Sequence, residues 1–299
     1  MEQLSGFHTL VVRRLHGVLF VTLNQPASRN ALGPALVAEL AATLTLAAQD
    51  TEVRALVLRG AGGMFCAGGN IGGFREVLNA RGDDDGSDPI AKRNRQFGHF
   101  MQQLTELPVP VLAVVEGAAM GGGFGLACAA DLVLSTGDAR FALSETTLGV
   151  IAAQIAPFVV ARLGAAHTRR LGLSGERVSG AQALALGLVD ALADDGAALD
   201  ALEAQWLTRI GRCAPDANRA FKPLVARAAS HEPVTALLDD AARVFAQCLR
   251  SEGAEGTLAF REKRDASWTV RFDADAVRAA HHCGDGPSAA SFPLERTAA

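Results

Sequence analysis

The chain has 299 residues, of which 49% are hydrophobic and 20% charged, as is typical of a folded globular protein. Its net charge is −4 and only 5% of its residues are aromatic, without a tyrosine, so no basic or stacking surface for nucleic acid or an anionic membrane is expected. The five cysteines are widely spaced and form no CxxC pair, which favours a reducing, cytoplasmic location over a disulfide framework.

The first half of the chain alternates predicted strands with predicted helices. Two β-branched runs on either side of Leu15-His16-Gly17 predict a hairpin. Gly33-Pro34 then opens an amphipathic helix, because proline suits the first helical turn and leucines recur on one face of the segment that follows. The predicted strands of this half cover residues 9–12, 18–23, 53–59, 110–115 and 132–135.

The second half of the chain is mainly helical. Its predicted helices cover residues 181–186, 197–212, 234–249 and 252–263. Because strands come first and helices later, we expect an α/β fold. We place its core at residues 1–200, a helical C-terminal region at 201–270 and a loose tail at 271–299.

Membrane and metal sites are not expected. The most apolar stretch, residues 110–130, is interrupted by Glu116 and by Gly121–Gly123, and the first eight residues lack the apolar segment of a secretion signal. The run His281-His282-Cys283 contains metal-ligand types, but it stands in the predicted tail without a second ligand pair. We therefore predict no metal ligands and no membrane partner.

Two glycine-rich turns carry the first functional signal. The first, Phe65–Ile71, follows a predicted strand, and the second, Gly117–Gly123, stands between a strand and a helix. Such glycines often serve only packing or an unusual backbone angle. Each turn also exposes a backbone N–H, and two such donors that converge on one point form an oxyanion hole. The second donor would gain from the positive end of its helix.

Further short motifs surround these turns in a fixed order. They are Asn24-Gln25-Pro26, residues 29–32, 115–117, 130–134, 141–149, 173–175, 183–189 and 260–264, followed by Trp268. Together with the two turns, they resemble the enoyl-CoA hydratase/isomerase (crotonase) family over residues 11–268. The resemblance implies a crotonase-like spiral of ββα units with a helical C-terminal trimerisation region, assembled as a homotrimer or as a hexamer of two trimers.

The resemblance also implies an acyl-CoA substrate and roles for individual residues. Coenzyme A enters as part of the thioester substrate, and no prosthetic group is implied. The N–H groups of Gly69 and Gly122 would bind the thioester carbonyl and stabilise an enolate. Residues implied to lie along coenzyme A are Arg29, Ala67, Gly68 and Ile71, and Phe260 and Lys263 are implied to reach the coenzyme A of a neighbouring subunit.

The catalytic acid–base positions depart from the family pattern. Family hydratases carry two glutamates 20 residues apart; Glu145 matches the second, whereas the first position is Gly125. One carboxylate therefore remains to take and return a proton. Because a glycine inside a helix costs up to ~1 kcal/mol relative to alanine, we hypothesise that position 125 needs room for substrate bulk or for a second water. Drift after loss of the acid is the alternative.

Three functions remain open. The strings Met120–Cys128 and Ala153–Phe158 are similar to isohexenylglutaconyl-CoA hydratases, enzymes of acyclic terpene degradation that act on a branched, acid-bearing enoyl-CoA. Single-glutamate members also include Δ3-Δ2-enoyl-CoA isomerases, in which one base suffices. A non-catalytic member that binds coenzyme A, RNA or a protein partner is a remote alternative, which the negative charge and the retained Glu145 disfavour. We predict a hydratase of a branched 2-enoyl-CoA.

Overall fold

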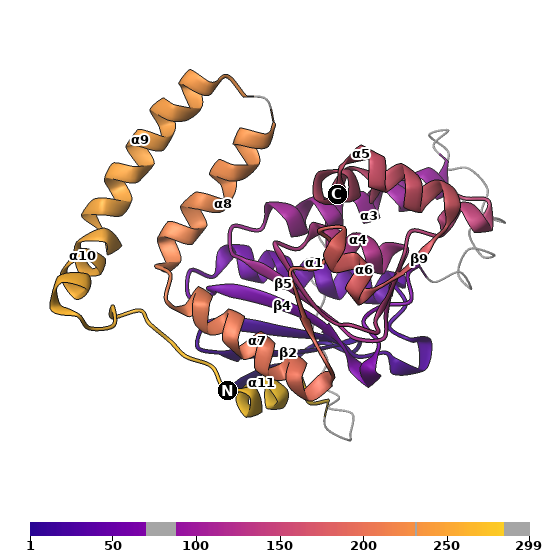
Figure 1. Cartoon of the computed structure of the whole chain (residues 1–299), viewed down its shortest axis with the longest axis horizontal. Helices are drawn as coiled ribbons and strands as arrows, with labels where there is room; N and C mark the ends of the chain where they lie inside the picture. Colours follow the sequence, from indigo (N-terminus) through magenta and orange to yellow (C-terminus); the bar gives the residue numbers. More distant parts are fainter. Residues whose placement is uncertain (70–87, 231, 284–299) are drawn as a thin grey trace, which may run out of the picture.

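A seven-stranded mixed sheet forms the centre of the computed structural model, which describes residues 1–69, 88–230 and 232–283 (Figure 1). Its strands, in spatial order, are β1 (Glu2–Leu4), β2 (Leu10–Leu15), β3 (Val18–Leu23), β4 (Ala55–Gly60), β5 (Val111–Val115), β7 (Leu132–Thr136) and β10 (Ala191–Ala193). The first three are antiparallel, which confirms the predicted hairpin, and β3 through β10 are parallel.

Helices cover both faces of this sheet, so its central strands are largely apolar and buried. All six residues of β3 are buried, with Leu19 and Val21 on one side and Val18 and Phe20 on the other. The first side packs against α1 (Pro34–Gln49), α3 (Pro89–Glu106), α4 (Gly122–Ala129) and α5 (Ala156–Ser174). The second side packs against α7 (Gly196–Gly211) and α11 (Ala274–His281).

A smaller three-stranded sheet lies beside the large one. It consists of β6 (Ala118–Met120), β8 (Arg140–Ala142) and β9 (Arg177–Ser179), and α6 (Gly180–Ala185) follows its last strand. Single helical turns occur at η1 (Pro26–Ser28), η2 (Ala61–Gly63) and η4 (Glu145–Leu148). Because β6 runs directly into α4, the second glycine-rich turn stands where the small sheet meets the helical layer.

Three helices project from this body as an arm (Figure 1). They are α8 (Pro215–Ala229), α9 (Val234–Arg250) and α10 (Glu252–Glu262). The last two are close to the predicted bounds, whereas α8 was not predicted. Lys222 ties α8 to the body, because its Nζ donates to Val109 O at 3.0 Å and to Asp131 Oδ2 at 2.7 Å. No helix in the described part of the chain is long and apolar enough to span a membrane.

Two predicted boundaries are wrong. Residues 201–211 belong to α7, whose Ala204 and Leu207 are buried against the central sheet and not in the arm. The predicted tail begins too early, since α11 buries Val277, Ala280 and His281 against α7 and the sheet. Both helices are amphipathic, and burial of their apolar sides joins them to the core.

Candidate active site

A hydrogen-bond ladder holds the two glycine-rich turns side by side. Phe65 N donates to Glu116 O at 2.9 Å and Cys66 N to Ala118 O at 2.9 Å, and Met120 N donates back to Cys66 O at 3.0 Å. A strand-like bridge between Cys66 and Ala119 is part of this ladder, and a second bridge joins Gly69 of the first turn to Leu32. The turns that the sequence singled out are therefore neighbours in space.

The ladder brings Gly69 and Gly122 together. A Cβ added to Gly122 would lie 3.9 Å from Gly69 N, so the two residues meet across the turns. Gly122 is the first residue of α4, where backbone N–H groups have no partner within the helix and the helix dipole is positive. This placement suits a pair of donors to one oxyanion.

Glu145 lies beside this helix start. It is the first residue of η4, and its Oε1 is 3.1 Å from the position of a Cβ added to Gly121. Its Oε2 is buried and has no hydrogen-bond partner among the residues that the structure describes. Burial raises the pKa of the Glu145 carboxyl above its usual range, an effect partly offset by a hydrogen bond from its own backbone. A carboxyl of this kind suits proton transfer.

Backbone angles explain why glycines stand at two of these positions. Gly121 has φ of 48° and Gly68 has φ of 97°, both in the region that favours glycine. A Cβ at Gly68 would also lie 2.8 Å from Met120 O. Larger residues would force the two turns apart.

Two apolar side chains approach Gly122: Leu32, from the motif at residues 29–32, and Phe97, which the sequence did not single out. A Cβ added there would lie 2.8 Å from Leu32 Cδ1 and 3.5 Å from Phe97 Cζ. Phe97 belongs to α3 and contacts Phe100 with ring centroids 5.8 Å apart. No element was predicted over residues 89–106, so the sequence analysis gave no sign of the contact that Phe97 makes.

The residues expected along coenzyme A fall into two groups. Arg29, Ala67 and Gly68 lie together near Gly69, since Ala67 N donates to Arg29 O at 3.0 Å and Leu32 N donates to Gly68 O at 2.7 Å. Phe260, 86% exposed, belongs to α10, and Lys263 is the C-cap of this helix. Figure 1 shows α10 on the side of the arm away from α4. Ile71 is outside the described residues.

The space beside Gly125 is filled. A Cβ added there would lie 2.4 Å from Ile155 Cγ2 and 2.8 Å from Ile155 Cβ. Ile155 precedes α5 and is 3% exposed. The hypothesis that glycine leaves room for substrate or water is therefore wrong: the room is taken by a side chain of the same chain.

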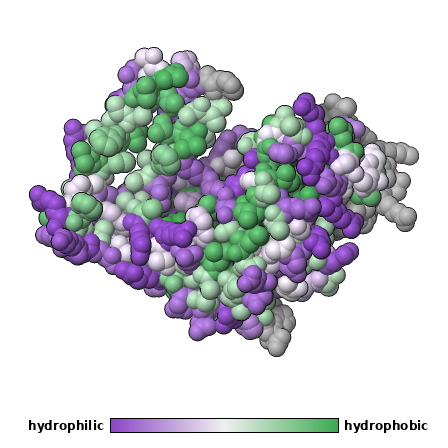
Figure 2. Space-filling view, in the orientation of Figure 1, coloured by the Kyte–Doolittle hydropathy of each residue, from purple (hydrophilic) through white to green (hydrophobic). Residues whose placement is uncertain are grey.

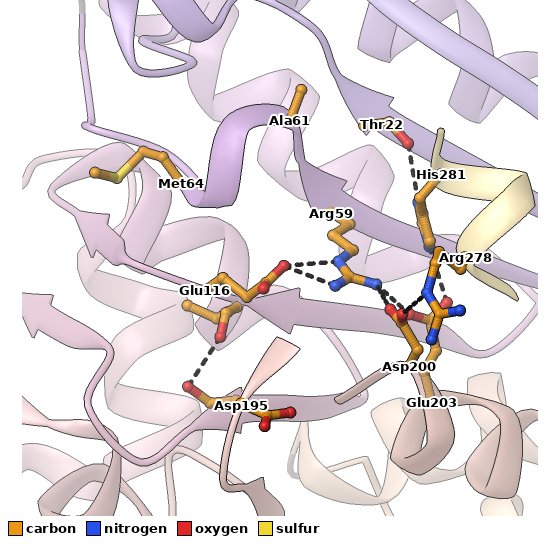
Figure 3. Close-up of polar contacts among 12 residues, drawn as sticks. Thr22, Arg59, Ala61, Met64, Glu116, Asp195, Asp200, Glu203, Arg278 and His281 are labelled. Carbon is orange, nitrogen blue, oxygen red and sulfur yellow. Dashed lines mark hydrogen bonds and ion pairs between the residues drawn. The ribbon is translucent and has the colours of Figure 1, made fainter. Parts of the chain in front are cut away.

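A buried polar cluster supports the first glycine-rich turn from the other side of the sheet (Figure 3). Arg59, at the end of β4, donates to Glu116 Oε2 at 2.7 Å and to Asp200 Oδ1 at 2.5 Å. Burial alone would lower the pKa of the Arg59 guanidinium, but Glu203, Glu116 and Asp200 hold it above its usual value. Glu116 thus joins this ion pair through its side chain and the turn through its backbone.

The same cluster fixes α11. His281 bridges Glu203 Oε1 and Thr22 Oγ1, each at 2.9 Å, and Arg278 Nε donates to Asp200 Oδ2 at 2.8 Å. These contacts give His281 a structural role in holding α11 against β3 and α7. Among the described residues, no group of three or more His, Cys, Asp or Glu side chains is arranged to hold a metal ion.

Comparisons with known proteins agree with this arrangement. Residues 13–271 match the family model described as enoyl-CoA hydratase/isomerase. An enoyl-CoA hydratase/isomerase structure from Marinobacter aquaeolei is 45% identical, with a TM-score of 0.84, and the match covers 88% of this chain and 99% of that one. Pseudomonas aeruginosa AtuE is 46% identical, with a TM-score of 0.83 and coverage of 88% and 100%.

A relative of assigned activity extends the comparison. The 2,3-dehydroadipyl-CoA hydratase of Escherichia coli is 31% identical over 264 residues, which cover 88% of this chain and 99% of the relative. The chain therefore belongs to the enoyl-CoA hydratase/isomerase family, and it is an enzyme with the crotonase fold.

Proposed function

We propose that the enzyme hydrates a branched 2-enoyl-CoA thioester and that Glu145 is its one general acid–base group. The observation that carries this proposal is the buried, unpartnered Oε2 of Glu145 beside the start of α4. An oxygen without a hydrogen-bond partner among the described residues is available to a water molecule or to a substrate proton.

The two glycine N–H groups and Glu145 divide the reaction between them. Gly69 and Gly122 donate to the thioester oxygen, which takes up negative charge as water attacks C3 and the C2=C3 electron pair moves to form an enolate. Glu145 accepts the proton that this water loses. It then returns a proton to C2, so that hydrogen and hydroxyl have been added across the double bond and the carboxylate is restored.

The absence of an acid at position 125 supports a single carboxylate. Gly125 has no side chain, and Ile155 occupies the adjacent space. Both proton transfers therefore fall to Glu145 in this proposal. The likeness of the Met120–Cys128 and Ala153–Phe158 strings to isohexenylglutaconyl-CoA hydratases supports a branched, acid-bearing acyl chain and a place in terpene degradation.

Double-bond migration is the alternative that the same observation favours. One carboxylate can take a proton from C2 of a 3-enoyl-CoA and return it to C4, and this reaction needs no activated water. A Δ3-Δ2-enoyl-CoA isomerase would therefore also accept glycine at position 125. The names of relatives such as 2,3-dehydroadipyl-CoA hydratase lead us to prefer hydration.

We propose further that coenzyme A lies along Arg29, Ala67 and Gly68. These residues adjoin the oxyanion donors, and Arg29 is exposed and cationic, as a phosphate ligand needs to be. Phe260 and Lys263 belong to α10, which lies on the side of the arm away from α4 (Figure 1), and this placement supports a contact with coenzyme A bound by a neighbour. Five free cysteines support a reducing, cytoplasmic location.

We also propose that copies of the chain assemble through the arm as a homotrimer or a hexamer. Val234, Leu238, Phe245 and Leu249 are exposed on α9 at spacings of 4, 7 and 4 residues, which places them on one helix face. Figure 2 shows hydrophobic residues gathered along α8 and α9. The trimerisation implied by the family resemblance makes a second copy the occupant of this face.

A panel of CoA esters tests the reaction. Linear and branched 2-enoyl-CoA and 3-enoyl-CoA esters are incubated with the enzyme, and the products are separated by mass and by double-bond position. We expect a mass gain of one water with branched 2-enoyl esters. Migration without water addition would establish the isomerase instead, and no turnover of any ester would contradict both.

A further inference from the structure

Gly125 and Ile155 make a contact that the proposed reaction does not use. Gly125 is buried inside α4, and a Cβ added there would lie 2.8 Å from Ile155 Cβ and 2.4 Å from its Cγ2. Rotation about χ1 moves Cγ2, but Cβ stays where the backbone places it. No rotamer of Ile155 therefore admits even a methyl group at position 125.

The backbone of Ile155 is held in place. It is the N-cap of α5, and its carbonyl accepts hydrogen bonds from Phe158 N at 3.1 Å and Val159 N at 3.0 Å. The preceding residue is docked on α3, because Gln154 Nε2 donates to Asn94 Oδ1 at 3.0 Å and Gln154 Oε1 lies where a Cβ of Gly98 would be. A small shift of Ile155 away from Gly125 would disturb both attachments.

The contact lies one helical turn from Glu145. Gly125 N donates to Gly121 O at 2.9 Å, so these two residues share one face of α4. Glu145 Oε1 approaches Gly121 on that face, and Ile155 approaches Gly125. A catalytic carboxyl and an isoleucine thus pack against successive turns of the same helix.

We propose that Ile155 is a specificity-determining residue, because it takes the place that an acidic side chain from position 125 would need and so limits the centre to Glu145. The inference rests on the proposed function, which assigns proton transfer to Glu145. In this proposal Gly125 on α4 and Ile155 before α5 act together, because the isoleucine fits only where position 125 has no side chain.

If Ile155 excludes a side chain at position 125, the effect of Gly125→Ala on Tm should have opposite signs in the presence and absence of the Ile155 side chain. Alanine is the better helix former, so Gly125→Ala would normally stabilise α4. We expect it instead to lower Tm by about 3 °C or more in the wild type. In an Ile155→Gly background, which removes the obstructing Cβ and leaves a residue acceptable at an N-cap, the same change should raise Tm.

Two matched variants sharpen this measurement. Ile155→Ala keeps the Cβ at 2.8 Å, so Gly125→Ala should still lower Tm in that background. Gly137 has no heavy atom within 4 Å of an added Cβ, so Gly137→Ala should not lower Tm in any background. A wild-type chain that becomes more stable with Gly125→Ala would overturn the proposal.

The specificity half is tested with a second acid. Gly125→Glu together with Ile155→Gly should hydrate crotonyl-CoA about tenfold faster, in kcat/KM, than Ile155→Gly alone, because a second carboxylate can bind and activate water. Gly125→Glu in the wild type should give no such gain. A gain in the wild-type background, or none in the paired variant, would overturn the assignment.

Failure of the proposed function has a different signature. A wild-type enzyme that adds water to no ester of the panel refutes hydration, whereas the Tm measurements still decide whether Ile155 excludes a side chain at position 125.

Discussion

At the residue scale, the position of Glu145 depends on what is missing from Gly121. A side chain there would lie 3.1 Å from Glu145 Oε1 and would also need φ of 48°. Glycine allows the carboxyl to approach the start of α4, where the Gly122 N–H group lies. Proximity of a proton carrier and an oxyanion donor is what the proposed enolate chemistry needs.

The oxyanion role of Gly122 can be isolated with proline. Proline is tolerated at the first position of a helix, so Gly122→Pro should remove the N–H while α4 persists. We expect kcat to fall about 100- to 1000-fold. Gly122→Ala is the control, since it places a Cβ against Leu32 but keeps the N–H. Equal losses in both variants would show that crowding, and not the lost donor, is responsible.

Glu145 should also destabilise the fold. Its pKa is raised by burial, so the ionised form is penalised in the folded state at pH values above that raised pKa. The penalty vanishes as the pH falls to the usual carboxyl range. Glu145→Gln should therefore raise Tm at about pH 8 but have little effect on Tm at about pH 4. Thermal unfolding at both pH values checks this, with the exposed Glu2→Gln as control; a stabilisation independent of pH would contradict it.

How far the sequence predicted this site varies from residue to residue. The two glycine turns and Glu145 stand in short motifs, so their proximity followed from the family resemblance. The sequence drew attention to Gly125, but it predicted room for substrate or water there, which is wrong. Ile155 stands in the string Ala153–Phe158, yet it is 30 residues from Gly125 and nothing in that string indicates that the two residues pack together. The position of Phe97 beside Gly122 was not predicted for the same reason. Packing between α3 and α4 depends on the whole fold and not on either helix alone.

At the scale of elements, the arm is joined to the body by cations on α8. Lys222 donates to Val109 O and to Asp131, and Arg219 donates to Asp50 O at 2.7 Å and to Val53 O at 2.6 Å. Burial lowers the pKa of Lys222, which Asp131 partly offsets. These bonds satisfy carbonyls at the end of α1, before β4 and before β5.

Lys222→Met should therefore weaken the attachment of the arm. The change removes the hydrogen bonds from the Lys222 ammonium group, and the Asp131 carboxylate then accepts, among the described residues, only the bond from Val111 N at 2.7 Å. We therefore expect the free energy of unfolding to fall by about 2 kcal/mol. Urea unfolding measures this. Arg261→Met, at an exposed position of α10, is the control and should change stability little. Equal effects of the two changes would show that Lys222 is only a surface charge.

Some elements could be predicted from the sequence pattern, whereas the long helices α3, α5 and α8 were not assigned. The hairpin, α1, β5, α9 and α10 follow from periodicity, turn residues and proline. Helix α11 was missed because it has only eight residues, and its anchor His281 meets Glu203 and Thr22 far away in sequence. A short amphipathic segment gives no sign of such partners.

At the scale of the whole molecule, the apolar face of α9 remains uncovered. Phe245 and Leu238 are 68% and 62% exposed, which is unusual for large hydrophobic residues on one stripe. In the proposed assembly this stripe is buried between copies, and α10 is brought to the substrate site of a neighbour. Oligomerisation would thus complete the coenzyme A site as well as the fold.

Replacement of this stripe should separate the copies. We expect Leu238→Asp with Phe245→Asp to lower the sedimentation coefficient from that of a trimer or hexamer to that of a monomer, because two buried charges oppose association. The control is Gln247→Asp, because Gln247 is an exposed residue of the same helix outside the stripe. This change should leave the assembly intact. A wild-type chain that sediments as a monomer would contradict the proposal directly.

The central claim is that one carboxylate carries both proton transfers, and the kcat of Glu145→Gln tests it most directly. The change preserves shape and removes the acid, so affinity for the CoA ester should persist while kcat falls by about 100-fold or more on the ester that the wild type hydrates best. Retention of more than about a tenth of wild-type kcat would contradict the account, since a group worth less than tenfold is not the general acid–base catalyst.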